Sequence, residues 1–319
     1  MPPVTLVIAV KNEVINLSAH LLFWVDQDYP KLEIILVDDH SEDGSVRIIE
    51  DYAENNENIR LYTNRGSGKK AALTTGISAA SGTWIITTDA DCKPASDQWI
   101  YDIMIERNDA DVILLYGPYH QVSGFLNKFI RYETWYIAMQ YLSLANVGLP
   151  YMGVGRNLAY KKDVFINQGG FSQHEHIKSG DDDLFIAGLS PETNIDLNLK
   201  SYTYSTPATS LSNLIQQKRR HLTTATSYPI KHQLILMTLF LSQLLFYTGL
   251  VGLFLGSTYI QIAIGLFIIR SIVLLWVAFN KMTLLKESKL WYWAPVLDIL
   301  LLIYYCIMGL MMSMKKKTW

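Results

Sequence analysis

Two pairs of carboxylates stand where short apolar stretches of the sequence end. Asp89 and Asp91 follow the apolar stretch 84–88, and Asp38 and Asp39 follow an earlier one. The carboxylates of Asp89 and Asp91, two residues apart, can hold a hard divalent cation. Such a cation can bridge a diphosphate and neutralise the charge that builds on a leaving group. An isolated pair of this kind is more often a solvated acidic turn. Asp89 and Asp91 therefore predict a metal site only in combination with the other motifs.

The segment that begins with Asp38 and Asp39 permits a binding interpretation and a structural one. Ser41 or Asp43 could cap the helix that follows, which is the structural alternative for that half of the segment. The pair itself has no capping role that we can assign. Its carboxylates could accept hydrogen bonds from a base N–H and from ribose hydroxyls, so we predict that Asp38 and Asp39 bind a nucleotide.

A glycine-rich turn with two lysines opens another predicted helix at residues 66–70. Backbone N–H groups and a lysine such as Lys69 at a helix start favour a bound phosphate. The spacing of a P-loop, G-x-x-x-x-G-K-[ST], is missing, so a P-loop NTPase is not supported. The structural alternative is a flexible glycine loop.

Three adjacent carboxylates, Asp181, Asp182 and Asp183, precede an apolar stretch. Clustered carboxylates repel one another, so the pKa of one of them should rise and a proton acceptor becomes plausible. The alternative is a helix N-terminus that acidic residues stabilise. Taken alone, the cluster favours this alternative.

The elements that must position these residues follow from the alternation of apolar and amphipathic stretches. Short runs rich in valine and isoleucine predict buried strands at 4–10, 33–37, 59–62, 84–88 and 112–116. Helix-like stretches lie between them, near 13–27, 44–55, 69–80 and 97–108. The alternation predicts an α/β fold with a doubly wound, mostly parallel sheet. Ligands of such sheets bind at the carboxyl ends of the strands. Lys11 and Glu13 also follow a strand, so we expect them in the same crevice.

Composition divides the chain into a soluble part and a membrane part. The chain has 319 residues and a formal net charge of −2, and residues 233–269 contain no Asp, Glu, Lys or Arg. A run of that length exceeds the roughly 20 residues that one helix needs to cross a bilayer. We therefore predict a catalytic domain at 1–205, an interfacial amphipathic segment at 206–230 and a membrane region at 231–319. Its apolar segments are 233–255, 258–279 and 291–314.

Charge and cysteine content argue against a nucleic-acid-binding protein and against a disulfide-linked one. The near-zero net charge and the lack of a basic cluster beyond the helix ends and the region around Arg219 argue against nucleic-acid binding. Cys92 and Cys306 lie in different regions, so a disulfide framework is not expected and a reduced, cytosolic setting fits. No signal peptide is visible before the first strand.

The basic segment around Gln217, Arg219 and Arg220 has leucines and an isoleucine at helical spacing. An amphipathic helix lying on anionic lipid explains this pattern. Basic side chains at a membrane surface can also clamp a diphosphate, and both interpretations can hold together.

Taken in order, the Asp38–Asp39 site, Asp89 with Asp91, Gly180–Asp182 and a Q-x-x-R-W-like segment resemble the inverting family-2 glycosyltransferases with the GT-A fold. The resemblance covers about residues 4–225 and extends loosely to the membrane part. It is to membrane-bound bacterial enzymes related to hyaluronan, cellulose and poly-N-acetylglucosamine synthases. Residues 153–160 also resemble the acceptor-site segment of that family, and residues 169–171 its usual sequel.

The resemblance implies a role for each matching position. Asp39 and Asp38 would contact the uridine of a UDP-sugar, and Asp89 and Asp91 would bind substrate and Mg²⁺ or Mn²⁺. Asp182 aligns with the general base, with Asp181 beside it. Gln217 and Arg220 align with the residues that grip the diphosphate, and Arg219, Lys69, Lys11 and Glu13 complete the expected donor site.

The resemblance implies a hexosyltransferase-type glycosyltransferase (EC 2.4) that moves a sugar, with inversion, to a lipid-linked or saccharide acceptor in cell-envelope synthesis. The aromatic position of the Q-x-x-R-W motif is His221 here if Gln217 starts the motif, and Arg220 if Gln216 does. The missing tryptophan argues against polymer synthesis. Relatives often carry a membrane helix before the first strand, and this sequence begins at that strand, so whether a preceding helix is missing stays open. The alternatives are a catalytically impaired nucleotide-sugar-binding membrane subunit and a nucleotidyltransferase.

We expect a multi-pass protein of the cell (inner) membrane with its catalytic domain facing the cytoplasm. Lys231 would lie inside, the turn near residues 256–258 outside, and Lys281, Lys286 and Lys289 inside again. A third full span would place Lys315–Lys317 outside, against the positive-inside rule. We therefore predict that 291–314, where Pro295 could break a helix, is re-entrant or interfacial, or that an earlier segment does not fully span.

Two charged residues, Arg270 and Asp298, lie within these apolar segments, where an unpaired charge is costly. We predict that they pair with each other, or that each lines a polar path near the active site. Snorkelling of each to a nearby interface is the alternative.

Overall fold

The computed structural model describes residues 1–177, 179–256 and 259–314, and the chain forms two compact units. The first unit holds residues 1–120 and 138–207, and the second holds residues 121–137 and the chain from residue 208. No sequence pattern predicted that residues 121–137 belong with the C-terminal part. The boundaries near residues 205 and 230 stay a prediction.

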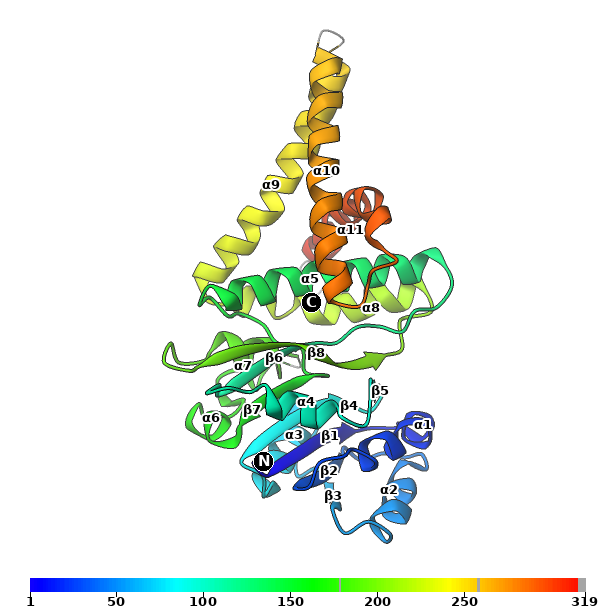
Figure 1. The fold of residues 1–319 in the computed structure, drawn as a ribbon, viewed down its shortest axis with the longest axis vertical. Helices are drawn as coiled ribbons and strands as arrows, with labels where there is room; N and C mark the ends of the chain where they lie inside the picture. The colour runs from blue at the N-terminus through cyan, green and yellow to red at the C-terminus, as the bar shows by residue number, and fades with distance from the viewer. Residues whose placement is uncertain (178, 257–258, 315–319) are drawn as a thin grey trace. The chain divides into compact units, whose positions relative to one another are not determined.

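A mixed sheet forms the centre of the first unit, and its eight described strands have the order β3-β2-β1-β4-β7-β6-β8-β5 (Figure 1). The strands are β1 (Val4–Val10), β2 (Leu32–Asp38), β3 (Ile59–Thr63), β4 (Trp84–Asp89), β5 (Cys92–Pro94), β6 (Val112–Tyr116), β7 (Leu158–Lys161) and β8 (Ile195–Ser205). The helices of this unit include α1 (Val14–Val25), α2 (Ser45–Ala53), α3 (Lys69–Ala79), α4 (Trp99–Ile105), α6 (Lys162–Asn167) and α7 (Asp183–Ala187). The predicted α/β class and all five predicted strands are confirmed.

The parallel half of the sheet winds in two directions from β1. The chain steps outward from β1 to β2 and β3, and α3 then returns it to β4 on the other side of β1. The strand order therefore reverses between β1 and β4, which is the switch point where open α/β sheets bind ligands. Asp89 is the last residue of β4 and lies at this point.

Antiparallel pairing appears only in the other half of the sheet. β7 runs antiparallel to both β4 and β6, and β5 runs antiparallel to β8, whereas β6 and β8 are parallel. β7 thus joins the two halves, so the residues just before it lie beside the end of β4.

The core of this unit is built from alternate residues of the strands. Leu6 and Ile8 of β1 belong to the buried cluster that includes Leu17, Leu21 and Trp24 of α1. These α1 residues are spaced four and three apart, as one face of a helix requires. Complete burial of each such side chain stabilises the fold by about 1.5–3 kcal/mol.

The second unit is helical throughout its regular elements. It contains the first part of α5 (Phe125–Asn146), together with α8 (Leu211–Leu222), α9 (Ile230–Leu255), α10 (Ile260–Leu284) and α11 (Ala294–Met314). α9, α10 and the stretch Trp291–Met312 are each long and apolar enough to cross a membrane. The three predicted apolar segments are therefore helical where they are described, and residues 257–258 and Lys315–Lys317 lie outside the described residues.

One buried carboxylate ties three of these helices together. Asp298 of α11 is only 2% exposed, and it accepts hydrogen bonds from Arg270 Nη2 at 2.8 Å, Tyr247 Oη at 2.7 Å and Gln243 Nε2 at 2.9 Å. The predicted pairing of Arg270 with Asp298 is confirmed. Because a charge in an apolar setting is costly without a partner, this pair allows both residues to lie within apolar helices.

Candidate active site

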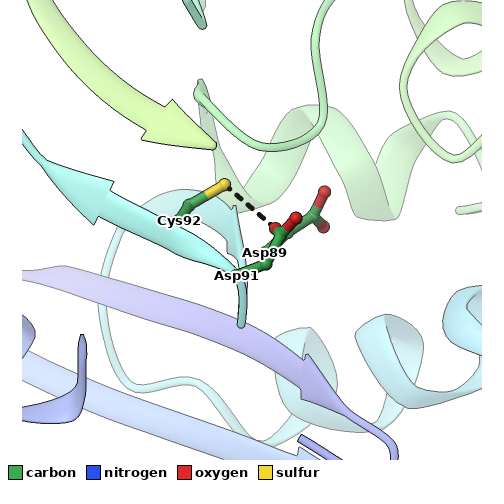
Figure 2. A group of neighbouring side chains, drawn as sticks. All are labelled: Asp89, Asp91 and Cys92. Carbon is green, nitrogen blue, oxygen red and sulfur yellow. Dashed lines mark hydrogen bonds between the residues drawn. The ribbon is translucent and has the colours of Figure 1, made fainter. Parts of the chain in front are cut away.

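The acidic pair at the end of β4 forms a compact group with a neighbouring thiol. One carboxylate oxygen each of Asp89 and Asp91 and the sulfur of Cys92 all lie within 4.8 Å of one another (Figure 2). The thiol donates to Asp91 Oδ1 at 3.4 Å and lies 3.1 Å from Ser205 Oγ. Burial raises the pKa of the Cys92 thiol well above its usual range, so it stays neutral. The anionic donors here are carboxylate oxygens, which suit a hard cation.

The electrostatics of this pair also favour a cation. Burial and the neighbouring charge of Asp89 raise the pKa of Asp91. Two carboxylates that repel each other in a half-buried turn are stabilised by any positive charge that enters between them. The residues therefore fit a divalent metal ion, with Asp89 and Asp91 as its protein ligands.

Lys69 links the acidic pair to the second acidic cluster. Its Nζ lies 2.8 Å from Asp89 Oδ1 and 2.8 Å from Asp181 Oδ2, although 37% of the side chain is exposed. Burial would lower the pKa of Lys69, but the carboxylates of Asp181 and Asp89 raise it well above its usual range. A permanently charged lysine thus stands at the first residue of α3.

Asp182 has the environment expected of a proton acceptor. Its Oδ2 accepts the backbone N–H of Gly155 at 2.7 Å. Burial, with the charges of Asp181 and Asp183, raises the pKa of Asp182 to about 7. A carboxyl with such a pKa can take up and release a proton near neutral pH.

The neighbours of Asp182 have other roles. Burial opposes ionisation of Asp181, but the bond to Lys69 holds its pKa below the usual value. α7 begins at Asp183, whose backbone N–H donates to Asp182 Oδ1 at 2.8 Å. The acidic helix N-terminus expected as the structural alternative is therefore present, and it coexists with the raised pKa of Asp182.

Asp38 and Asp39, at the end of β2, accept hydrogen bonds from neighbouring groups of the protein itself. Asp39 accepts from the backbone N–H of Gly68 at 2.9 Å, from Asn64 Nδ2 at 2.5 Å and from Lys11 Nζ at 3.3 Å. Asp38 accepts the backbone N–H of Ser41 at 3.2 Å. The Gly68 N–H thus donates to Asp39 and not to an open phosphate cradle, while the start of α3 at Lys69 agrees with the sequence.

Glu13 completes the group at the carboxyl ends of the parallel strands. Burial raises the pKa of Glu13, and the charges of Asp91 and Asp89 raise it further, so the three carboxylates lie near one another. The first unit thus brings Lys11, Glu13, Asp38, Asp39, Lys69, Asp89, Asp91, Asp181 and Asp182 to the region around the switch point. Their individual roles stay predictions.

Residues 155–157, just before β7, are held beside Asp182 by hydrogen bonds between segments far apart in the sequence. Asn157 donates to the carbonyls of Tyr116 and Ser201 and accepts from Trp99 Nε1 at 3.1 Å. The carbonyl of Arg156 accepts from two threonine hydroxyls, at 2.8 and 2.9 Å. These bonds fix residues 155–157 beside Asp182. The only sequence signal was the resemblance of 153–160 to an acceptor segment.

The predicted diphosphate-binding residues lie in the other unit. Gln217, Arg219 and Arg220 are on α8, and Arg220 is exposed. Lys218, between them, forms an ion pair with Glu133 at 3.0 Å. The approach of α8 to the donor stays a prediction.

A cavity of about 900 Å³ lies elsewhere in the first unit, between α3 and the segment from α6 to Glu175. Its lining includes Lys70, Thr74, Phe165 and Phe171 but none of the carboxylates at the switch point. The predicted site residues of this unit therefore lie at the strand ends and not around this cavity.

Comparison with known proteins supports the same assignment. The sequence model of the family described as "Glycosyl transferase family 2" matches residues 5–168. Probable glycosyltransferase YdaM of Bacillus subtilis is 27% identical over 187 residues, covering 54% of this chain and 43% of YdaM. Undecaprenyl-phosphate 4-deoxy-4-formamido-L-arabinose transferase of Aeromonas hydrophila is 42% identical over 96 residues, covering 28% of this chain and 29% of that enzyme. The chain thus matches less than half the length of either relative.

A solved structure shares the fold over nearly the whole chain. It is a mannosyltransferase of Pyrobaculum calidifontis in complex with GDP-Man and Mn²⁺, with a TM-score of 0.59, 18% identity, and coverage of 93% of this chain and 87% of that one. At this identity the likeness shows the fold, which is GT-A. The family match extends over slightly more than half of the chain. The chain therefore belongs to glycosyl transferase family 2.

Proposed function

We propose that the protein transfers a hexose from a UDP-sugar to a lipid-linked or saccharide acceptor, with inversion at the anomeric carbon. The observation that carries this proposal is Asp182, a half-buried carboxyl with a pKa raised to about 7, next to Asp181, which Lys69 links to Asp89. Inverting transfer requires one positioned base and a strong electrostatic sink for the departing diphosphate. Asp182 is proposed as the base, and Lys69 with a metal ion at Asp89 and Asp91 would form the sink.

The base acts on the acceptor. The acceptor oxygen attacks C1 of the sugar while its proton passes to Asp182, and UDP leaves from the opposite face. The Gly155 N–H holds the Asp182 carboxylate at 2.7 Å and so fixes the direction of its lone pairs. Asp181 keeps Lys69 at the site, where its charge can stabilise the leaving diphosphate.

Asp89 and Asp91 are proposed to hold Mg²⁺ or Mn²⁺. The carboxylate donor set, the mutual repulsion of the two groups and the neutral thiol of Cys92 support a hard cation. Bound there with the donor, the ion would neutralise charge on the diphosphate. The mannosyltransferase of the same fold was solved with GDP-Man and Mn²⁺, which supports this assignment and makes GDP-Man the donor to test against UDP-sugars.

We also propose a membrane arrangement in which α9 and α10 span the bilayer and α11 lies at its cytoplasmic surface. Figure 1 shows α11 almost end-on, whereas α9 and α10 lie closer to the plane of the view. Over two turns α11 lies beside α5: Tyr132 Oη lies 3.5 Å from Asp298 Oδ1, the ring of Tyr304 packs edge-on against Phe129, and Tyr305 Oη lies 3.4 Å from Glu133. Glu133 is itself paired with Lys218 of α8. Charged residues beside the middle of α11 favour an interface over the bilayer centre.

The acceptor is proposed to reach the site from the membrane. The relative from Aeromonas hydrophila is named as a transferase that acts with undecaprenyl phosphate, and the apolar helices of the second unit would place the catalytic unit close to lipid. A lipid-linked acceptor is therefore preferred over a soluble saccharide.

The test uses the full chain, purified in detergent, with UDP-glucose, UDP-galactose, UDP-N-acetylglucosamine and GDP-mannose. We expect release of UDP from one UDP-sugar in the presence of Mg²⁺ or Mn²⁺, and no release in EDTA. Asp91→Asn should lose most of the activity at every metal concentration. Full activity in EDTA would reject the metal, and release of GDP alone would reject the UDP donor. Tight binding without turnover of any donor would favour a catalytically impaired binding subunit.

A further inference from the structure

Arg156 brings a positive charge to the acidic pair without forming an ion pair there. Burial raises the pKa of Asp91 and of Cys92, and the charge of Arg156 is among the groups that lower both, so the guanidinium lies near them. Yet among the described residues no carboxylate lies within 4.0 Å of its nitrogens. The charge of Arg156 is thus available to another anion.

The side chain is seated by groups that leave part of it unused. Its Nε donates to the carbonyl of Gly117 at 3.1 Å, Nη2 donates to the same carbonyl, and the guanidinium lies 4.7 Å from the ring centre of Tyr119. A Cβ on Gly117 would lie 2.7 Å from Nε, so glycine is needed there. Within the described parts of the chain, Nη1 donates to no protein group.

The backbone of Arg156 is fixed as firmly as its side chain. Its carbonyl accepts from Thr88 Oγ1 of β4 at 2.9 Å and from Thr203 Oγ1 of β8 at 2.8 Å. The preceding residue, Gly155, donates to Asp182. Arg156 is therefore held next to the proposed base, with a fork of donors that needs no reorganisation to bind an anion.

The position of Arg156 separates it from the nucleotide. Asp38, Asp39 and Lys69 follow β2 and β3, on one side of β4. Arg156 precedes β7 and bonds to Gly117 after β6, on the other side of β4. If the donor lies over the first side, as proposed above, the second side faces the acceptor.

We propose that Arg156 binds a phosphate group of the acceptor, so that the acceptor is a phosphorylated compound and not a neutral saccharide. This inference rests on the proposed function. A guanidinium presents parallel N–H donors that match two phosphate oxygens, and it stays charged at any working pH. The donor diphosphate is the other possible source of such an anion, and the experiment separates the two.

The experiment measures binding by calorimetry to the full chain in detergent micelles with Mn²⁺ and UDP present. The probes are citronellyl phosphate and its uncharged alcohol, citronellol. We expect the phosphate to bind about tenfold or more tightly than the alcohol, as a charge-assisted contact implies. Arg156→Gln should abolish this difference while the Kd for UDP changes less than about threefold. The control Arg47→Gln removes one exposed charge on α2 and should change neither value.

Three results would overturn the proposal: equal binding of both probes by the wild-type chain, unchanged phosphate binding by Arg156→Gln, or an equal loss of UDP affinity in that variant. The last would assign Arg156 to the donor diphosphate. If Arg156→Gln does not fold, Arg156→Lys carries the test, because it keeps the charge but loses the fork, and a partial loss is expected. A wild-type chain that binds no UDP would reject the proposed function itself.

Discussion

Asp182 differs from its two neighbours in what surrounds its carboxyl group. Asp181 is neutralised by Lys69, and Asp183 lies at the first residue of α7. Asp182 alone has an acidic neighbour on both sides within the cluster. Desolvation together with these two charges raises its pKa to about 7, while the pKa of Asp181 is lowered. Asp181 and Asp182 thus acquire different protonation behaviour from position alone, which is how one cluster can supply both a base and an anchor for a lysine.

The proton affinity of Asp182 should depend on Lys69. Asp182 must be deprotonated to act as a base, so kcat/KM should fall as the pH drops through about 7. The charge of Lys69 is one of the groups that lower this pKa, so Lys69→Met should raise it and move the acidic limb of the pH profile to higher pH, with a lower plateau. A pH series of kcat/KM measures this.

Lys31→Met is the matched control, because Lys31 is an exposed lysine of the same unit. Its profile should coincide with that of the wild type. A limb that stays in place in Lys69→Met, or that moves to lower pH, would show that Asp182 does not govern the profile.

The carboxylates of the site and its lysines could be predicted from the sequence, whereas the role of the residues just before β7 could not. Asp89 and Asp91 follow an apolar stretch, and Asp181 and Asp182 precede one, so pattern alone singles them out. Arg156 meets Gly117 across 39 residues. No local pattern carries such a contact, because it depends on the pairing of β6 with β7. The hydrogen bond from the Gly68 N–H to Asp39 could not be predicted either, because it also joins residues that are far apart in the sequence.

At the scale of elements, α3 is positioned by a glycine. A Cβ at Gly76 would lie 2.6 Å from Val7 Cγ1 and 2.9 Å from Val37 Cγ2, so α3 packs directly on β1 and β2 at this point. Gly76→Ala should therefore lower the free energy of unfolding by about 1–3 kcal/mol through overpacking, despite the roughly 1 kcal/mol that alanine contributes in a helix. Because α3 carries Lys69, activity should fall as well.

Thermal unfolding of the full chain in detergent measures this change. Gly252→Ala is the matched control, since a Cβ at Gly252 meets nothing within 4 Å. It should leave the melting temperature of the catalytic unit unchanged. A Gly76→Ala variant as stable and active as the wild type would contradict the close packing of α3.

The parallel half of the sheet and β6 could be predicted from the sequence, whereas β5 and β7 could not. Buried parallel strands are continuous apolar runs, so β1, β2, β3, β4 and β6 were recognised from composition and spacing. β7 has four residues, Leu158–Lys161, and β5 has three. Such short segments have no measurable periodicity, and their antiparallel pairing is decided by partners far away in the chain.

At the scale of the whole molecule, the proposed topology predicts that residue 317 and the catalytic unit lie on the same, cytoplasmic side of the membrane. If α9 and α10 span and α11 is interfacial, a single cysteine introduced after residue 317 should be labelled only when intact cells are permeabilised, in a Cys92→Ser, Cys306→Ser background. Labelling by a membrane-impermeant reagent from outside would show three true spans and contradict this topology. A cysteine in the turn near residue 256 is the control, and it should be labelled from outside.

The most direct test of the central claim compares Asp182→Asn with Asp183→Asn in the same assay. The account predicts that Asp182→Asn lowers kcat by about 10²–10⁴-fold, because base catalysis acts in the transition state. Its affinity for the UDP-sugar should stay within about threefold of the wild type, and Asp183→Asn should keep most of its turnover. If Asp182→Asn turns over at nearly the wild-type rate while Asp183→Asn or Asp181→Asn does not, Asp182 is not the base and the account is wrong.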